Sequence, residues 1–268
     1  MKKQYYKFQH LQNNTFSTLF VGQNIIKLKE VDSTNNFLKD LASKSAPLAE
    51  GTVIMADHQF AGRGQQASVW KTEPGMNISM SILLKPSFLA LAKHFYLNMA
   101  ISLGICEALS LIANQPLSIK WPNDIYYNSQ KLGGILIENT LTGNKIKSAI
   151  IGIGLNVNQK EFDAELSSKA TSLYQILHKH VSLEAVMDKI FVYIEKYYLN
   201  LRSEKYDFLS DAFLKHLYKF NTPSLYRSNG QVFEGTITGV EEGGQLRVSI
   251  DGRTESFNLK EIEFLHTQ

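Results

Sequence analysis

The stretch from Leu117 to Asn158, LSIKWPNDIYYNSQKLGGILIENTLTGNKIKSAIIGIGLNVN, decides the fold. It holds four runs that are typical of β-strands, LSIKW, DIYYN, KLGGILIENTL and NKIKSAIIGIGLNVN, and short turns at 128–130 and 142–144 separate the last three. Connections this short join antiparallel neighbours. The stretch therefore predicts a sheet in which consecutive strands run antiparallel.

Segments before and after this stretch supply more strands and the helices. Ile25–Val31 alternates like a strand and leads into a helical pattern with capping residues at Asp32 or Ser33. Further strands are predicted by GTVIMADHQ (51–59) and NISMSILLK (77–85), and helices by the apolar run through Ala113 and by 183–201 and 206–220. We predict an α+β fold, a mixed, largely antiparallel sheet with helices packed on one side.

The end of the chain has a different pattern. After Thr222, short alternating strands are separated by Asn-Gly, Gly-Gly and Asp-Gly pairs, each a tight-turn signal. These hairpins predict a small β-barrel. The junction before it predicts two domains, residues 1–221 and residues 222–268, with the polar motifs of the first domain between 31 and 158.

Composition limits the classes of function. The 268 residues are 44% hydrophobic, enough for a packed core, and a net charge of +3 is too balanced to indicate a nucleic-acid partner. A single cysteine, Cys106, excludes an intramolecular disulfide, and the N-terminus lacks the apolar run of a signal peptide. Charged residues interrupt the apolar stretch 89–113, as in a buried helix rather than a membrane span. We expect a cytoplasmic protein.

One segment, AGRGQQASVW at 61–70, has no hydrophobic period and lies between two predicted strands, so it is a loop. Gly62 and Gly64 would allow positive φ and exposed amides, and Arg63 would offer a planar fork to a phosphate. Taken alone, such an arginine is more often solvated, and Trp70 is more often a core aromatic residue.

Three other polar segments stand out: DSTNN (32–36), KWPND (120–124) and KLGGILIE (131–138). If they converge with the loop, Lys131 adds a second cation and Asp124 a carboxylate for a metal or a proton. Ser33, Thr34 and Gln59 would add neutral hydrogen-bonding groups. Together these groups suggest a site that joins a nucleotide to an organic acid.

Each residue also has a structural explanation. Ser33 and Thr34 are typical helix caps, and Asp124 is a typical turn residue. A Gly-Gly pair in a strand, such as Gly133–Gly134, is more often a β-bulge than a place where a ligand or another backbone approaches closely. GIGLNVN lacks the third glycine of a dinucleotide fingerprint, because Val157 stands there. Phosphate-binding P-loop and zinc motifs are absent from the sequence as well.

DSTN, QFAGRGQQASVW, KWPND, KLGGILIE and GIGLNVN, in this order, resemble the biotin protein ligases, also called biotin–[acetyl-CoA-carboxylase] ligases. The resemblance covers about 31–158. It implies a class II synthetase-like catalytic domain, and the C-terminal hairpins resemble the family's SH3-like barrel. It also implies that biotin and ATP form biotinyl-5′-AMP, which then biotinylates a lysine of a biotin carboxyl carrier protein.

The resemblance also implies residue roles. Lys131, Arg63 and Asp124 would be catalytic, and Lys120 and Asn123 would support them. No residue is assigned as a metal ligand; Mg²⁺ is expected with ATP, and Asp124 is the candidate carboxylate near it. The biotin-binding set would be Ser33, Thr34, Asn35, Gln59, Gly62, Arg63, Gly64, Lys131, Gly133 and Gly134. The nucleotide-binding set would be Arg63, Trp70, Asn123, Lys131 and Asn156.

The sequence departs from the family pattern in the loop, commonly G-R-G-R-R-G-x-x-W, where Gln65, Gln66 and Ala67 replace two arginines and a glycine. We expect this loop to hold the anionic adenylate less firmly. About 30 residues precede DSTN, too few for the winged helix-turn-helix of some relatives. We therefore expect a single-function ligase without a nucleic-acid partner, and a homodimer is compatible with the family.

Two other interpretations stay open. A lipoate- or octanoate-type protein ligase or acyl transferase of related fold would share the architecture but carry a different glycine and arginine pattern in the loop. A biotin-binding sensor without catalysis would not need Lys131 and Asp124. A purely structural module would explain none of the polar segments.

Overall fold

The computed structural model describes residues 8–12, 16–44, 47–65 and 68–265. Its main sheet has eight strands in the order β1-β2-β3-β4-β8-β7-β6-β5. The strands are β1 (Phe8–Gln12), β2 (Ile25–Val31), β3 (Val53–Gln59), β4 (Ile78–Leu84), β5 (Ser118–Lys120), β6 (Asp124–Tyr127), β7 (Gln130–Thr142) and β8 (Lys145–Leu155). All the strands predicted before Asn158 are present, and β1 adds one that the sequence pattern did not indicate.

The strand directions confirm a mixed, largely antiparallel sheet. β2 and β3 run parallel because α1 crosses over between them, and the other neighbouring pairs run antiparallel. The stretch from Leu117 to Asn158 folds as β5-β6-β7-β8, a meander of consecutive antiparallel strands at one edge of the sheet. The α+β class is confirmed.

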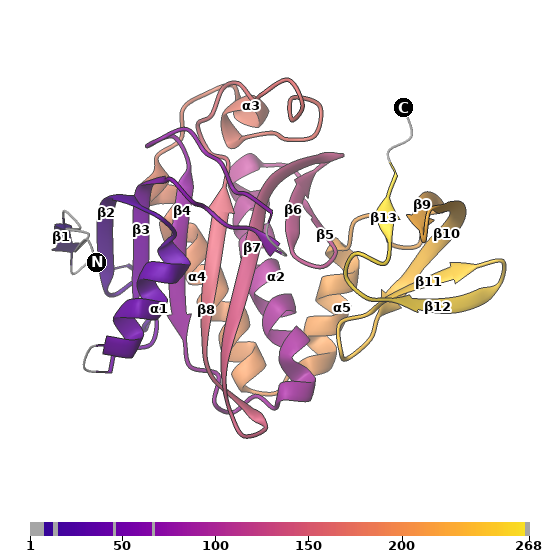
Figure 1. The fold of residues 1–268 in the computed structure, drawn as a ribbon, viewed down its shortest axis with the longest axis horizontal. Helices are drawn as coiled ribbons and strands as arrows, with labels where there is room; N and C mark the ends of the chain where they lie inside the picture. The colour runs from indigo at the N-terminus through magenta and orange to yellow at the C-terminus, as the bar shows by residue number, and fades with distance from the viewer. Residues whose placement is uncertain (1–7, 13–15, 45–46, 66–67, 266–268) are drawn as a thin grey trace.

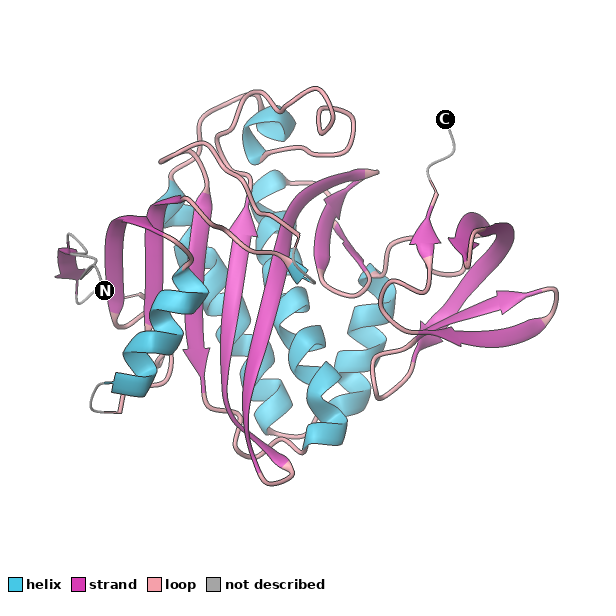
Figure 2. Cartoon of the chain, in the orientation of Figure 1, coloured by secondary structure: helices cyan, strands magenta, loops and turns pink. Residues whose placement is uncertain are grey.

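The helices are α1 (Thr34–Lys44), α2 (His94–Ala113), α3 (Leu173–Leu177), α4 (Leu183–Arg202) and α5 (Tyr206–His216). The prediction that they share one side is wrong for α1. In Figures 1 and 2, α1 lies in front of the sheet, and α2, α4 and α5 lie behind it. Phe37 and Leu38 of α1 form a separate small core with Leu28, Ile54 and other sheet residues, whereas the larger core lies on the opposite face.

Helix α2, with the short 3₁₀ turn η2 (Leu91–Lys93) before it, is the one helix in the described part of the chain long and apolar enough to cross a membrane. It lies inside the fold, however, with 67% of its apolar window buried. Cys106 lies on this helix, and burial raises the pKa of its thiol to about 12. The prediction of a buried core helix is therefore confirmed, and a buried thiol with a raised pKa is unreactive.

Helix α5 is shorter than the predicted 206–220. It ends at His216 because Leu217 adopts an extended conformation and forms a bridge with Ile119. The next backbone N–H, of Tyr218, donates to the carbonyl of Ile119 at 2.9 Å. Lys219 then has a φ of 61°, so the chain turns away rather than continuing the helix.

The C-terminal strands form a second, five-stranded antiparallel sheet in the order β12-β11-β10-β9-β13. The strands are β9 (Ser224–Ser228), β10 (Gln231–Val240), β11 (Leu246–Ile250), β12 (Arg253–Phe257) and β13 (Glu263–Phe264). The Asn229-Gly230 and Asp251-Gly252 pairs form its hairpin turns, with positive φ at all four residues. This sheet packs beside β5 and α5 (Figure 1).

Candidate active site

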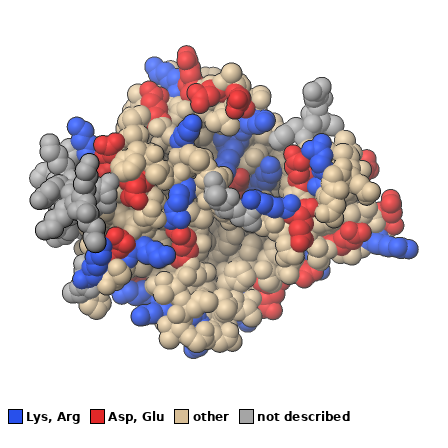
Figure 3. Space-filling view, in the orientation of Figure 1, with Lys and Arg blue, Asp and Glu red and all other residues tan. Residues whose placement is uncertain are grey.

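A cleft of about 1320 Å³ lies over the face of the sheet that carries α1, and residues near β13 also line it. All four polar segments of the sequence reach it. Figure 3 shows lysine and arginine side chains around the hollow between the main sheet and the C-terminal strands. The predicted site residues that line the cleft are Ser33, Thr34, Asn35, Gln59, Arg63, Gly64, Trp70, Lys120, Asn123, Asp124, Lys131, Gly134 and Asn156.

The start of α1 forms a neutral end of the cleft. Gln59 Oε1 accepts hydrogen bonds from the backbone N–H of Thr34 at 2.8 Å and from the Thr34 hydroxyl at 3.1 Å. The helix therefore takes its capping acceptor from β3, not from the side chain of Asp32 or Ser33. Ser33 is only 3% exposed, and its hydroxyl has no protein hydrogen-bond partner in the described part of the chain. That hydroxyl is free to bind a ligand.

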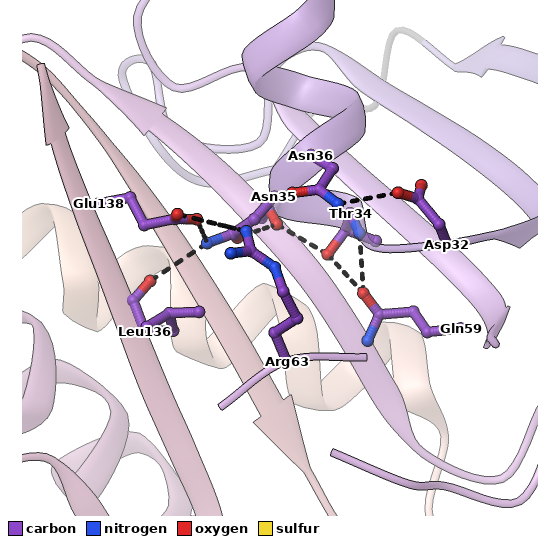
Figure 4. A network of polar contacts seen from close by, with 9 residues as sticks. Asp32, Thr34, Asn35, Asn36, Gln59, Arg63, Leu136 and Glu138 are labelled. Carbon is purple, nitrogen blue, oxygen red and sulfur yellow. Dashed lines mark hydrogen bonds and ion pairs between the residues drawn. The ribbon is translucent and has the colours of Figure 1, made fainter. Parts of the chain in front are cut away.

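Asn35 lies beside this end with its amide fully occupied. The Ser81 hydroxyl donates to Asn35 Oδ1 at 2.6 Å, and Asn35 Nδ2 donates to Glu138 Oε2 at 2.6 Å (Figure 4). A Cβ on Gly152 would lie 2.5 Å from Asn35 Oδ1, so only glycine leaves room for this amide. Asn35 thus connects β4, α1 and β7, and its contacts are with protein groups.

The glycine-rich loop folds back on itself. Gly62 accepts a hydrogen bond from the Trp70 amide at 2.9 Å, and the Gly64 amide donates to the carbonyl of Ser68 at 2.7 Å. Neither glycine has positive φ, so that expectation is wrong. A Cβ would lie 2.4 Å from Trp70 O at Gly62 and 2.3 Å from Ser68 Oγ at Gly64. Glycine is needed here for close packing within the loop, and Gly64 does not offer a free amide to an anion.

Arg63 projects from this loop toward β7. Its Nη2 donates to both carboxylate oxygens of Glu138, at 3.0 and 3.2 Å (Figure 4). The side chain is 41% exposed, so it is neither buried nor fully solvated. Of the three residues that replace the family's loop pattern, Gln65 lines the cleft, whereas Gln66 and Ala67 lie outside the described residues.

The Trp70 indole packs against Gly154 of β8. A Cβ on Gly154 would lie 2.4 Å from the Trp70 indole, so the glycine makes space for the ring. The indole Nε1 is buried and has no hydrogen-bond partner among the described residues. The ring forms part of the cleft wall, as expected for a residue that packs against a ligand rather than in the core.

Lys131 and Asp124 form an ion pair, with 2.7 Å between Nζ and Oδ1. Strands β6 and β7 place Asp124 opposite Gly134, and a Cβ there would lie 3.1 Å from Oδ1 and 3.2 Å from Nζ. Gly134 therefore makes room for the pair. Gly133 packs instead against Gly154 and Leu155 of β8 and, like Gly62, does not line the cleft.

Asn123 and Asn156 hold the backbone around the cleft. Asn123 Nδ2 donates to the carbonyl of Ile135, and Asn156 Nδ2 donates to the carbonyl of Thr171 at 3.1 Å. Both side chains are at most 5% exposed. Each side-chain amide thus fixes the backbone of a neighbouring segment beside the cleft.

Lys120 lies where the cleft meets the C-terminal sheet. Its Nζ is 4.9 Å from the ring centre of Tyr126 and 5.1 Å from that of Phe264, and it donates to the Tyr126 hydroxyl at 3.2 Å. Burial lowers the pKa of this lysine, and Lys131 adds to that effect while Asp124 opposes it. Unlike Arg63 and Lys131, it forms no ion pair with a carboxylate in the described part of the chain.

The comparisons with known proteins agree with this geometry. Residues 28–156 match the model of the biotin/lipoate A/B protein ligase family. A bifunctional ligase/repressor, BirA, from Bacillus spizizenii is 32% identical over 248 residues, which cover 92% of this chain and 75% of that protein. The chain belongs to the biotin protein ligases. The biotin–[acetyl-CoA-carboxylase] ligase of Paracoccus denitrificans is 28% identical to this ligase and is covered to 91%.

Solved structures agree with the fold of the ligase. The biotin protein ligase of Aquifex aeolicus, in complex with biotin and ATP, superposes with a TM-score of 0.76 at 28% identity, covering 91% of this chain and 99% of that one.

Several residues of the ligase site were missed by sequence reasoning. Glu138 and Ser81 bind Asn35, and Gly152 and Gly154 accommodate Asn35 and Trp70. The alternation of β7 was a usable signal for Glu138, because it places a carboxylate on the same face as Gly134. Ser81 carried no such signal, since only pairing of β4 with β8 brings it to Asn35.

Proposed function

We propose that this cleft activates biotin with ATP and transfers it to a lysine of a biotin carboxyl carrier protein. One observation carries the proposal: the neutral end formed by Ser33, Thr34 and Gln59 shares a cleft with the charged groups Arg63 and the Lys131–Asp124 pair. Such a cleft suits a substrate with an uncharged polar head and a reacting carboxylate. The Aquifex relative was solved with the same two small molecules, biotin and ATP.

In the first step, a biotin carboxylate oxygen bonds to the α-phosphorus of ATP, the bond to the β-phosphate oxygen breaks, and pyrophosphate leaves. Both reactants are anionic. Arg63 and Lys131 would offset their repulsion and the charge that develops on the phosphate. Since each cation is already paired with a carboxylate, the phosphate would take over donors that the ion pairs leave unused.

In the second step, the neutral amine of the carrier lysine attacks the acyl carbon, the bond to the AMP oxygen breaks, and an amide forms. Asp124 lies at the reacting end of the cleft and would orient the incoming ammonium and receive its proton. Lys131, held 2.7 Å from Asp124, would remain near the departing phosphate. One ion pair would thus serve both steps.

Magnesium would enter this reaction with ATP. The described residues include no cluster of three or more His, Cys, Asp or Glu that suits a resident metal ion. Asp124, paired with Lys131 in the cleft, is the carboxylate that would contact such an ion, which fits a Mg²⁺ held mainly by triphosphate oxygens and at most one side chain. The ion supplies positive charge to the phosphates when it is bound.

The proposal is tested by incubating the protein with ATP, Mg²⁺, labelled biotin and a carrier domain that presents its lysine. We expect label on the carrier, and we expect Lys131→Ala to lower the rate roughly a hundredfold, as for loss of a group that stabilises transition-state charge. Lys145→Ala, on the hairpin between β7 and β8, is the matched control and should leave the rate unchanged.

Two outcomes would contradict the proposal. Labelled lipoate or octanoate transferred in place of biotin would indicate a ligase with the other substrate. Tight biotin binding without pyrophosphate release, and with Lys131→Ala behaving like the parent, would indicate a sensor.

A further inference from the structure

We infer that Glu138 is a positioning residue for Arg63, and that it connects the neutral end of the cleft to the phosphate-binding end. The inference rests on the proposed function. Glu138 lies on β7 with its side chain 28% exposed, and among the described residues its carboxylate accepts hydrogen bonds from Arg63 and Asn35 alone. A half-buried carboxylate needs such partners, since its lost hydration is otherwise uncompensated.

The geometry at the guanidinium leaves donors free for a substrate. Only Nη2 of Arg63 contacts Glu138, through both carboxylate oxygens. A guanidinium carries five N–H donors in a rigid fork, so Nη1 and Nε remain without a partner in the described residues. Glu138 can therefore hold Arg63 by one edge while the other edge faces an anion.

The Glu138 carboxylate, which holds Arg63, is itself held in place by hydrogen bonds. Asn35 Nδ2 donates to Glu138 Oε2 at 2.6 Å, and the Ser81 hydroxyl holds the other end of the Asn35 amide at 2.6 Å. The same hydroxyl lies 2.7 Å from Thr34 Oγ1, and the backbone N–H of Thr34 donates to Gln59 Oε1 at 2.8 Å. A continuous chain of hydrogen bonds thus runs from Gln59 to Arg63 across β3, α1, β4 and β7 (Figure 4).

The need for such a support follows from the position of Arg63. It lies between two glycines on a loop and is 41% exposed, so without a partner its long side chain would sample many rotamers. Fixing it before ATP binds removes that entropy cost from the reaction. The carboxylate also offsets one positive charge, which leaves orientation, rather than net charge, as its main contribution.

The test compares Glu138→Gln with the parent in two assays. Biotin binding by calorimetry without ATP should change less than about twofold, because Ser33 and Gln59 keep their positions, whereas kcat for biotin-dependent pyrophosphate release should fall roughly ten- to hundredfold. Glu107→Gln is the matched control, since Glu107 pairs with Lys196 at 2.7 Å and similar exposure outside the cleft. It should leave both values unchanged.

A double-mutant cycle separates positioning from a merely structural role. With Arg63→Ala already present, Glu138→Gln should cost less than about twofold more, because no guanidinium remains to be held. Equal or faster pyrophosphate release by Glu138→Gln alone, or a full additional loss in the Arg63→Ala background, would overturn the inference. Absence of pyrophosphate release from the parent itself would instead contradict the proposed function.

Discussion

At the scale of single residues, two cations of the cleft, Arg63 and Lys131, each form an ion pair with a carboxylate. Sequence reasoning treats Lys131 as an anion ligand and Asp124 as a proton acceptor, but their atoms lie 2.7 Å apart. Arg63 is likewise paired, with Glu138. A cation in an ion pair is held in one place, and that placement matters more for a short-lived transition state than its bare charge does.

Gln65 permits a direct test of how firmly the adenylate is held. Replacing it by arginine adds a cation at the cleft, and one charge-assisted hydrogen bond to the phosphate would slow escape of biotinyl-adenylate roughly tenfold or more. Release of labelled adenylate after a chase with unlabelled biotin measures this rate. Gln65→Met is the uncharged control, and equal release from Gln65→Arg and the parent would contradict the prediction.

Lys120 should make stability depend on pH. Burial lowers its pKa in the folded chain from the usual 10.5. Between the lowered value and 10.5, the unfolded chain therefore binds more protons than the folded chain. The free energy of unfolding therefore rises with pH across this window, by at most about 1.4 kcal/mol per pH unit for one group.

Lys120→Met removes this contribution while keeping most of the apolar stem. Its free energy of unfolding, from urea denaturation between pH 7.5 and 9.5, should rise less with pH than that of the parent. Burial lowers the pKa of Lys219 in both proteins, so the comparison reports the loss of Lys120 together with its repulsion from Lys219. Parallel curves would show that Lys120 is not perturbed.

At the scale of elements, the sequence GIG in β8 has a packing explanation. Gly152 and Gly154 point to the cleft face, where the sheet receives Asn35 and Trp70. The intervening Ile153 points to the main core and is 2% exposed. The alternation of β8 thus gives one face to the core and leaves the other flat enough for the site.

Gly154→Ala should displace the Trp70 indole, because the added Cβ would lie 2.4 Å from the ring. We expect kcat/KM for biotin ligation to fall roughly tenfold, about 1.4 kcal/mol of transition-state stabilisation. In a Trp70→Ala background the same change should cost little more, since the methyl group then meets no ring. Equal losses in both backgrounds would show that Gly154 acts on something other than Trp70.

At the scale of the whole molecule, the KWPND segment joins the two sheets. The Trp121 indole N–H donates to the carbonyl of Gly244 at 2.9 Å, and Phe95 packs against the same glycine, which has a φ of 95°. Lys120 contacts Phe264 of β13, while Asn123 and Asp124 serve the cleft. The segment that contacts the C-terminal sheet therefore also carries two residues of the cleft.

Trp121→Phe should weaken this junction. It leaves the Gly244 carbonyl without its donor, at a cost of about 1–3 kcal/mol, and should lower Tm by several degrees for a chain of this size. We also expect a higher KM for ATP, because residues near β13 line the cleft. Calorimetry and initial rates measure the two effects. Val232→Thr, at an exposed position of β10, is the control, and a variant as stable and as active as the parent would refute the coupling.

Sequence periodicity determined most of the secondary structure, because alternation and tight turns are local properties. The strands of the meander, helices α2 and α4 and the C-terminal hairpins follow from it. The end of α5 at His216 does not, because the bridge between Leu217 and Ile119 competes with the helix. The face chosen by α1 also depends on long-range packing, since its apolar residues fit either side of a sheet.

The family motifs in the sequence determined which segments form the site, since residues such as Arg63, Asp124 and Lys131 are recognisable by type and order. Only the tertiary structure decided which carboxylate pairs with which cation, that Glu138 is the partner of Arg63, and that Gly62 and Gly64 serve loop packing rather than positive φ. The reason is physical. Residue type fixes what a side chain can donate or accept, but its partner is set by strand pairing and loop packing between positions far apart in the chain.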